Sequence, residues 1–336
     1  MREPRILIVF VRAGVEAYPD AEAHLDALYL AQLPDVRRDV LVVDNLLPPG
    51  VHESSPGRTV IGGDNSAWEF SAVDVAVAHV GGAIWQYDLV NVVTSAFEQL
   101  YVAYLERFVP PVVSAVVGQR VCLGHIDCYN APVRIGPFRS QHWLRSCFLL
   151  MPVTELKLLG TFVSAAHRTP WFSGNVDDPF GPHSPVDGTY RKYLTDWLLG
   201  EDIGQGVAWH RKITLDDAGL HHFEQKARAI LNEHLLGVRL RAAGCRLIDM
   251  TWLSAQLRAG VMPDWLTPWW SQLGGRDRDA IRLDVGALSH QPLGDGQADE
   301  GAGNQSSTCV GSEEESAAAE CCGESARVRD SADTPR

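Results

Sequence analysis

Apolar runs of strand length alternate with helix-length amphipathic stretches over the first 130 residues. Continuous or nearly continuous apolar runs predict strands at 5–11, 40–43, 59–61 and 87–93. The intervening pattern predicts helices at 21–33, from about residue 66, and at 96–108, with a Pro-Gly turn at 48–50. Strands that alternate with helices are typical of an α/β fold, in which an open, mostly parallel twisted sheet is covered by helices on both faces.

The second half of the chain has a less regular pattern. Helical periodicity predicts helices at 142–150, 155–166, 190–199 and 218–235, and strands are expected at 119–123 and 245–249. The Pro- and Gly-rich stretch 169–188 is too long for a plain connection, so it is either a functional loop or a lid. We therefore expect a mainly helical second half.

The last 48 positions, 289–336, differ in composition from the rest. They consist of Gly, Ser, Ala, Gln and acidic residues, with very few bulky apolar side chains. Such a segment cannot bury enough surface to offset the entropy of ordering, so we predict a disordered acidic tail. The remainder, 1–288, is expected to form a single domain.

Charge and cysteine usage narrow the class of protein. The net charge is -13, and the predicted tail carries most of the excess. An acidic body without a basic stripe argues against nucleic acid as a partner, because phosphate contacts need clustered Lys and Arg. No apolar run reaches the roughly 20 residues of a membrane span, and we expect no signal peptide. The seven cysteines lack zinc-type CxxC pairs, so reduced thiols in a cytoplasmic protein are expected.

Polar side chains follow three of the predicted strands. In parallel sheets ligands bind beyond the carboxyl ends of the strands, so these side chains are candidates for a nucleotide site. A carboxylate after the second strand can accept hydrogen bonds from ribose hydroxyls, although a local turn in which Asp caps its own loop is the alternative. The candidates are Asp44 and Asn45, Asp64 and Asn65, and Thr94 and Ser95.

The segment after the first strand argues against a dehydrogenase or methyltransferase fold. It reads Arg12-Ala-Gly-Val15, with one glycine where a dinucleotide or methyl-donor fold has a glycine-rich turn. A methyltransferase that uses Asp44 for ribose is therefore a weaker alternative. A GxSxG elbow and a Walker loop are also absent from the sequence.

Five short motifs combine strand ends with polar turns: VVDN at 42–45, VIGGDNSAWEFSA at 60–72, YDLVNVVTSAF at 87–97, GHIDCY at 124–129 and QHWLRSCFLL at 141–150. They resemble motifs of glycosyltransferases with the GT-A fold, and are most similar to the family 2 type and the rhamnan-synthesis-protein F group. The resemblance covers about residues 4–165. It implies a nucleotide-binding half, about 1–130, and an acceptor-side half, 131–288. It also implies a role in polysaccharide biosynthesis, with a nucleotide diphosphate sugar as donor and a glycan, lipid-linked or small-molecule acceptor.

The resemblance also implies roles for the strand-end residues. Asp44 would contact the base or ribose of the donor, with Asp64 and Asn65 beside it. Where the family pattern has an acidic metal-binding motif, this chain has Val93, Thr94 and Ser95. Hydroxyls are poor substitutes for carboxylates around Mn²⁺ or Mg²⁺, so a divalent metal is doubtful. Either the enzyme works without that contact, or the protein is a non-catalytic relative that binds a nucleotide or a carbohydrate.

Glycosyl transfer needs a base for the acceptor proton and a means of stabilising the departing diphosphate. Asp127 is the candidate base, because it follows a predicted strand, and His125 lies two residues earlier. Arg145 is the candidate for the diphosphate, since a guanidinium binds phosphate oxygens in a fork. The structural alternatives are a core histidine, a turn-forming aspartate and a surface salt bridge.

Two further groups have structural interpretations. Trp265, Trp269 and Trp270 could contact a membrane interface or pack as a clasp near the end of the body, and we favour the clasp. Glu69 is explained by its place at a helix start, although it could also face the cleft.

The histidines His210, His221, His222 and His234 do not match a metal-ligand pattern. We therefore assign them to a surface helix.

Overall fold

The structure is a computed structural model that describes residues 3–98, 102–165, 170–200 and 212–273. Its main element is an eight-stranded sheet with the order β10-β6-β9-β5-β1-β2-β4-β3. The strands are β1 (Arg5–Arg12), β2 (Arg37–Asp44), β3 (Gly50–Ser55), β4 (Arg58–Gly62), β5 (Leu89–Thr94), β6 (Val121–Gly124), β9 (Phe148–Pro152) and β10 (Arg246–Asp249). Strand β9 runs antiparallel to both its neighbours, and β3 is antiparallel to β4 at the edge; the other pairs are parallel.

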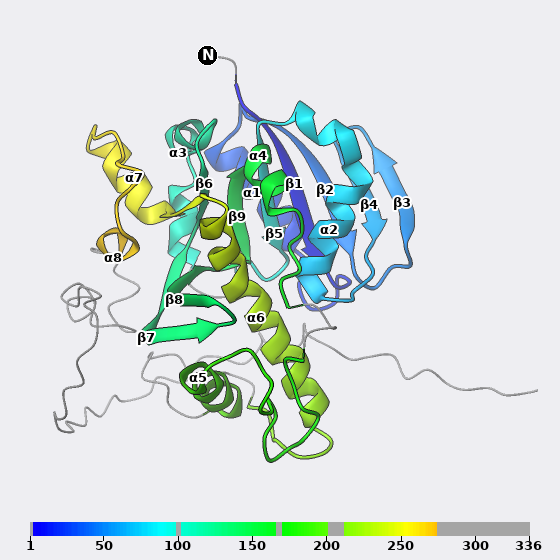
Figure 1. Ribbon diagram of the computed structural model, residues 1–336. Coiled ribbons are helices and arrows are strands. Elements are labelled where there is room, and N and C mark those ends of the chain that lie inside the picture. The colour runs from blue at the N-terminus through cyan, green and yellow to red at the C-terminus, as the bar shows by residue number, and fades with distance from the viewer. Residues whose placement is uncertain (1–2, 99–101, 166–169, 201–211, 274–336) are drawn as a thin grey trace, which may run out of the picture.

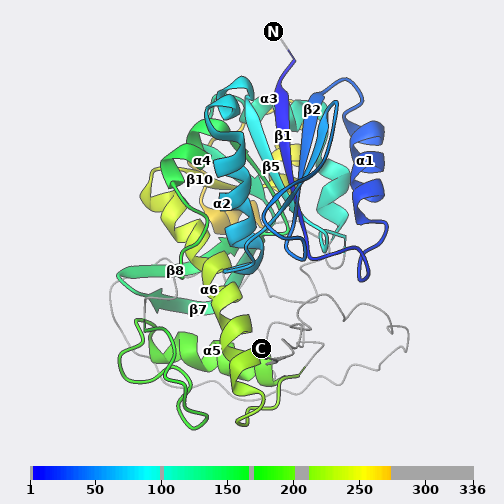
Figure 2. The same ribbon diagram turned by 90° about the vertical axis from the view of Figure 1, so that its right-hand side faces the viewer.

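Helices cover both faces of this sheet (Figures 1 and 2). On one face lie α2 (Trp68–Val80), α4 (Val153–Leu159) and the C-terminal part of α6 (Leu220–Ala242). On the other face lie α1 (Ala21–Gln32), the 3-10 helix η2 (Val102–Arg107), α3 (Pro110–Val116) and α7 (Met250–Arg258). The 3-10 helix η1 (Gly81–Gln86) leads into β5, and the short α8 (Trp269–Gln272) follows α7.

The alternation of side chains along β1 shows why both faces need a cover. Leu7, Val9 and Val11 point into the core beneath α2 and α4, whereas Ile8 and Phe10 point into the core beneath α1 and α3. All five are nearly or fully inaccessible to solvent. A strand buried on both faces reads as a continuous apolar run, which is the pattern that the sequence has here.

A second, smaller unit lies below the carboxyl edge of the sheet (Figure 1). It contains the two-stranded hairpin of β7 (Ile126–Ile135) and β8 (Phe138–Leu144), the helix α5 (Gly188–Leu199) and the N-terminal part of α6. Its core is rich in aromatic rings, including Tyr129, Trp143 and Tyr190. Helix α6 passes from this core into that of the main sheet, so it joins the two.

The fold class expected from the sequence is confirmed. A mostly parallel sheet carries helices on both faces, and most predicted strands and helices lie within a few residues of the observed ones. The predicted tail, 289–336, lies outside the described residues. None of the helices in the described ranges is long and apolar enough to cross a membrane.

Three helix predictions were wrong. Residues 142–150 form the end of β8 and the start of β9; the apolar run Phe148–Met151 is buried on both sides because β9 is a central strand. The helix expected at 96–108 is replaced, in its described part, by a turn and η2. The helix expected at 155–166 ends at Leu159, because Gly160 has a φ of 79° and terminates it.

The described part of the Pro- and Gly-rich stretch, 170–187, packs onto the smaller core. Trp171, Phe180 and Val186 are buried there. Val186 also forms an isolated bridge with Ile135 at the end of β7. This segment therefore contributes to the second core in the conformation seen.

Candidate functional site at the carboxyl edge of the sheet

The carboxyl ends of the parallel strands meet at one edge of the sheet, which faces the smaller unit (Figure 1). Because β9 is antiparallel, the residues just before it also lie at this edge. The backbone confirms this: the Thr94 amide donates to the carbonyl of Cys147 at 3.0 Å, and the Arg145 amide donates to the carbonyl of His125, also at 3.0 Å. The structure thus brings the predicted catalytic residues to the same edge as the predicted nucleotide-binding residues.

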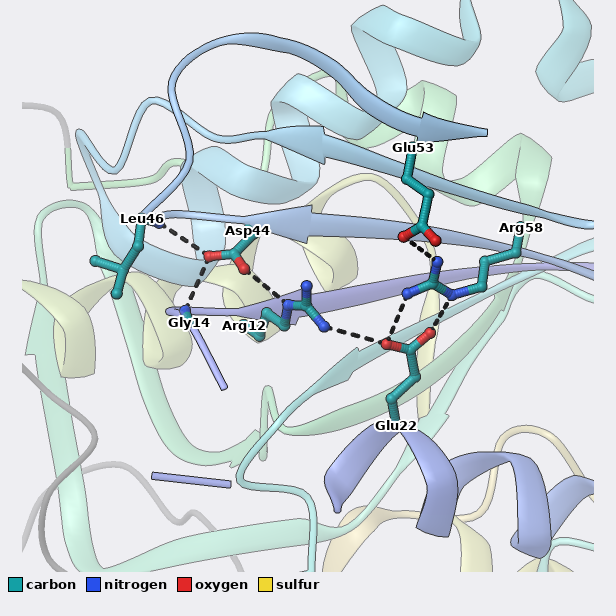
Figure 3. Close-up of polar contacts among 7 residues, drawn as sticks. All are labelled: Arg12, Gly14, Glu22, Asp44, Leu46, Glu53 and Arg58. Carbon is teal, nitrogen blue, oxygen red and sulfur yellow. Dashed lines mark hydrogen bonds and ion pairs between the residues drawn. The ribbon is translucent and has the colours of Figure 1, made fainter. Parts of the chain in front are cut away.

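Asp44 is the most fully bonded of the strand-end residues (Figure 3). It lies at the end of β2 and its side chain is 5% exposed. Its Oδ2 accepts from Arg12 Nε at 2.8 Å, and its Oδ1 accepts from the backbone amides of Gly14 at 2.8 Å and Leu46 at 3.0 Å. Asp44 therefore fixes the loops that follow β1 and β2. Direct contact with a ribose or base would have to displace some of these bonds.

The ion pair between Asp44 and Arg12 continues into a wider network (Figure 3). Arg12 also donates to Glu22 on α1 at 3.2 Å, and Glu22 in turn accepts from Arg58 on β4. Arg58 donates to Glu53 on β3 at 2.6 Å. Charges of alternating sign thereby connect strands β1 to β4 with α1 next to the candidate site.

The loop before α2 holds Asn45, Asp64 and Asn65 close together. Asn45 Nδ2 donates to the carbonyl of Trp68 at 3.1 Å, and Asn65 has a φ of 50°, which is uncommon for a residue other than glycine. Asp64 is exposed and accepts from the amide and the hydroxyl of Ser66. Burial acts to raise the pKa of Asp64, but these hydrogen bonds outweigh it and lower the pKa overall.

Two glycines allow this loop to lie so close to the end of β2. A Cβ atom on Gly62 would lie 1.8 Å from the carbonyl oxygen of Pro48, and one on Gly63 would lie 2.0 Å from Asn45 Oδ1. The first contact would require a backbone shift, and the second would require the Asn45 side chain to move. The glycine pair in the sequence is thus explained by close approach, not by phosphate binding.

Asp127 and Arg145 form an ion pair at the junction of the sheet and the hairpin. Arg145 Nε donates to Asp127 Oδ2 at 3.1 Å, and Asp127 Oδ1 accepts from the amide of Cys128. The Asp127 side chain is 3% exposed, whereas that of Arg145 is 21% exposed. The carboxylate is therefore well placed to orient the guanidinium, which reaches the protein surface.

His125 lies deeper than these two residues. It is fully buried, its ring stacks on Tyr104 with centroids 5.5 Å apart, and its Nδ1 lies 3.7 Å from Asp249 Oδ2. Asp249 caps α7 through the amides of Thr251 and Trp252. This position matches the alternative of a core histidine.

Glu233 on α6 belongs to the same edge and was missed from the sequence. Its Oε1 accepts from the Ser146 amide at 2.7 Å and from the Ser146 hydroxyl at 2.9 Å. Burial raises the pKa of Glu233, with Asp127 adding to the effect, while Ser146 and Arg145 oppose it. Its only sequence signal is a carboxylate beside His234 within a helix that the apolar pattern predicts.

Glu69, in the first turn of α2, faces the same region. Burial raises its pKa to about 7, and the charge of Glu233 contributes to this shift, so the two carboxylates lie within electrostatic reach. Lys226 on α6 lies over the ring of Trp68, with Nζ 4.7 Å from the centroid. Helix α6 therefore connects the start of α2 to the segment before β9. Glu69 therefore lies at the start of α2, as expected for a capping residue, and its carboxyl is within electrostatic reach of Glu233.

The remaining sequence interpretations have mixed outcomes. His234 was expected on a surface helix, but it is 1% exposed, and its Nδ1 lies 2.5 Å from the Tyr129 hydroxyl and 2.7 Å from that of Tyr190. That assignment was wrong, because α6 buries this face in the aromatic core. His210 lies outside the described residues. The clasp is confirmed for Trp269, which stacks on His142 at 4.9 Å.

The donor set at this edge is a poor match for a divalent metal. Thr94 and Ser95 supply hydroxyls, and Asp44 is occupied by Arg12 and backbone amides. Among the described residues, no three His, Cys, Asp or Glu side chains gather in a way that could hold a metal ion.

Comparison with known proteins yields no family. No family model matches the sequence, and no curated protein does. Two solved structures are similar at low identity. One is a 4-diphosphocytidyl-2C-methyl-D-erythritol synthase, with 11% identity, 46% of this chain and 77% of that chain covered, and a TM-score of 0.31. The other is the mannosyltransferase PcManGT from Pyrobaculum calidifontis in complex with GDP-Man and Mn²⁺. Its sequence is 14% identical, the match covers 78% of this chain and 77% of that chain, and the TM-score is 0.31. Similarity at this level transfers no function.

Proposed function

We propose that the protein is a GT-A-like transferase that uses a nucleotide diphosphate sugar. The observation that carries this proposal is the ion pair of Asp127 and Arg145 at the carboxyl edge of the sheet, near the end of β5 and the start of β9. In an open parallel sheet this edge is where nucleotides bind. A guanidinium held in place there by a buried carboxylate is suited to a diphosphate.

The roles that we propose follow from exposure and bonding. Arg145 binds the diphosphate and stabilises the charge that develops on it as the sugar leaves. Asp127 was the candidate base from the sequence, but an attacking hydroxyl would have to compete with Arg145 for its Oδ2, so orientation of Arg145 is the role we favour. Thr94, Ser95 and Asn65 are proposed to line the donor site, and Asp44 to support it by fixing the adjacent loops.

The finer parts of the proposal concern acceptor and location. We propose a glycan, a lipid-linked glycan or a small molecule as acceptor, bound on the side of the smaller unit, and a role in polysaccharide biosynthesis. A cytoplasmic location is supported by the four cysteines in the described ranges, Cys122, Cys128, Cys147 and Cys245, which are all free thiols.

A non-catalytic relative that binds a nucleotide or a carbohydrate is the second candidate. The observation that favours it is the absence of a carboxylate after β5, where Thr94 and Ser95 stand, together with the internal bonding of Asp44. The two candidates differ in turnover. A binding protein would be stabilised by the ligand without releasing a nucleoside diphosphate.

The test uses the full chain with UDP-glucose, UDP-N-acetylglucosamine, dTDP-rhamnose, GDP-mannose and UDP-galactose, each with and without Mn²⁺. Binding is measured as a rise in melting temperature, since a ligand that binds the folded state stabilises it. Turnover is measured as release of nucleoside diphosphate. We expect binding and slow hydrolysis of at least one donor, both lost in Arg145→Ala. Stabilisation without turnover would favour the binding protein. No response to any donor would contradict the transferase and a nucleotide-binding relative, and would leave a carbohydrate-binding relative.

A further inference from the structure

Helix α6 carries a carboxylate to the predicted site that the sequence motifs do not include. Glu233 lies at the point where α6 passes between the sheet and the smaller unit, one residue before His234 of the aromatic core. It is half-buried, and Ser146 holds it through both the backbone amide and the hydroxyl. Ser146 directly follows Arg145, so the two charged side chains are positioned from adjacent residues.

The two oxygens of Glu233 have different surroundings. Oε1 accepts both bonds from Ser146, whereas Oε2 accepts no hydrogen bond from any of the described residues. One oxygen therefore anchors the carboxylate, and the other is available to a ligand. Asp127 differs in this respect, since its Oδ2 is bonded to Arg145, its Oδ1 accepts from Cys128, and it is nearly inaccessible to solvent.

The charges around Glu233 come from four elements. Arg145 precedes β9, Asp127 belongs to β7, Glu69 begins α2, and Lys226 lies two turns earlier on α6. The Arg145 cation favours the ionised form of Glu233, while Asp127 and burial favour the protonated form. Their balance raises the pKa of Glu233 above its ordinary value of 4.5, and a higher pKa makes a carboxylate a stronger proton acceptor.

We propose that Glu233 is the general base that accepts the proton of the acceptor hydroxyl, and that it acts on the side of the site that faces the smaller unit. This rests on the proposed transferase function. The acceptor oxygen forms a bond to the anomeric carbon, and the bond from that carbon to the diphosphate oxygen breaks. Its electron pair leaves with the diphosphate, which Arg145 stabilises. The hydroxyl proton passes to Glu233 Oε2 and then to solvent.

Glu233→Gln tests this assignment, because the amide oxygen can still accept from Ser146 while the basic oxygen is lost. With the donor that the unaltered protein turns over, we expect at least a 100-fold loss of turnover. The donor-induced rise in melting temperature should stay within a factor of two of the unaltered protein, since donor binding is assigned to Arg145. The matched control is Glu224→Gln on the same helix, where the carboxylate accepts from the Gly174 amide at 3.2 Å. Full turnover is expected there.

The dependence of turnover on pH gives a second readout that needs no variant. A base must be ionised, so turnover in the unaltered protein should fall as the pH drops through a pKa above 4.5. Glu233→Asp, which keeps a carboxylate but shortens the side chain, should recover part of the activity lost in Glu233→Gln. Equal turnover in Glu233→Gln and the unaltered protein would overturn the assignment and leave the transferase proposal standing. Absence of turnover in the unaltered protein would overturn both.

Discussion

Asp44 allows a sharp test of how the candidate site is supported. Asp44→Asn removes the negative charge but keeps an acceptor for the amides of Gly14 and Leu46. Breaking a buried ion pair typically costs about 3–5 kcal/mol, because it leaves one charge without compensation. The Arg12 side chain is 16% exposed and keeps its bond to Glu22, so we expect a smaller loss of about 2 kcal/mol in the free energy of unfolding.

Asp44→Ala removes the acceptor as well as the charge. The amides of Gly14 and Leu46 then lose their partner, and this should add about 1–2 kcal/mol to the loss. Equilibrium denaturation in urea at pH 7.5, followed by tryptophan fluorescence, measures both variants on the full chain. The difference between them gives the contribution of the two loop amides.

The matched control is Asp196→Asn on α5. Its partner Lys192 has a side chain that is 77% exposed, so this i,i+4 pair should contribute less than about 0.5 kcal/mol. A loss below about 0.5 kcal/mol for Asp44→Asn would refute our account of the Asp44 bonds as a clamp and would return Asp44 to the role of a nucleotide ligand.

Three further substitutions test particular contacts by denaturation in urea. The pKa of Glu69 is raised from 4.5 to about 7 in the folded protein, so the unaltered protein should lose stability as the pH rises through this range. Glu69→Gln removes this loss, and it should therefore stabilise the protein by about 1–2 kcal/mol more at pH 8 than at pH 5. Equal effects at both pH values would contradict the raised pKa. Gly63→Ala should cost at least about 2 kcal/mol through the clash with Asn45, and a neutral effect would show that the loop can move. His234→Phe should cost about 1–3 kcal/mol by removing the ring nitrogen that both the Tyr129 and the Tyr190 hydroxyl contact. Burial lowers the pKa of His234 to about 3, so the free energy of unfolding of the unaltered protein should fall as the pH drops below 6.5. The same drop in pH should reduce the free energy of unfolding of His234→Phe by less. Equal pH dependence of the two proteins would contradict the burial of His234.

The local pattern was sufficient for β1, α1, β2, β4, α2 and β5, but not for the edge strand β3 or for η2. Strand β1 is buried on both faces, and its apolar run 5–11 could only be a buried strand or a short buried helix. The pattern failed at 142–150, because the polar residues of β8 and the apolar start of β9 together imitate a helical period. The antiparallel direction of β9 depends on long-range pairing with β5 and β6, which no local pattern encodes.

The candidate site was predictable only in part for a related reason. Asp127 and Arg145 could be named because each lies within a motif, and the structure brings them together at 3.1 Å. Glu233 could not be named, because its bond to Ser146 joins residues 87 positions apart. The internal use of Asp44 was also hidden, since it depends on the loop after β1 turning back toward β2.

Release of nucleoside diphosphate from nucleotide sugars by the full chain tests the central claim most directly. We predict that at least one donor of the panel is hydrolysed or transferred by the unaltered protein, and that Arg145→Ala and Glu233→Gln both lose this activity while Glu224→Gln keeps it. Absence of release with every donor, with and without Mn²⁺, would contradict the assignment of this edge as the site of a nucleotide-sugar transferase.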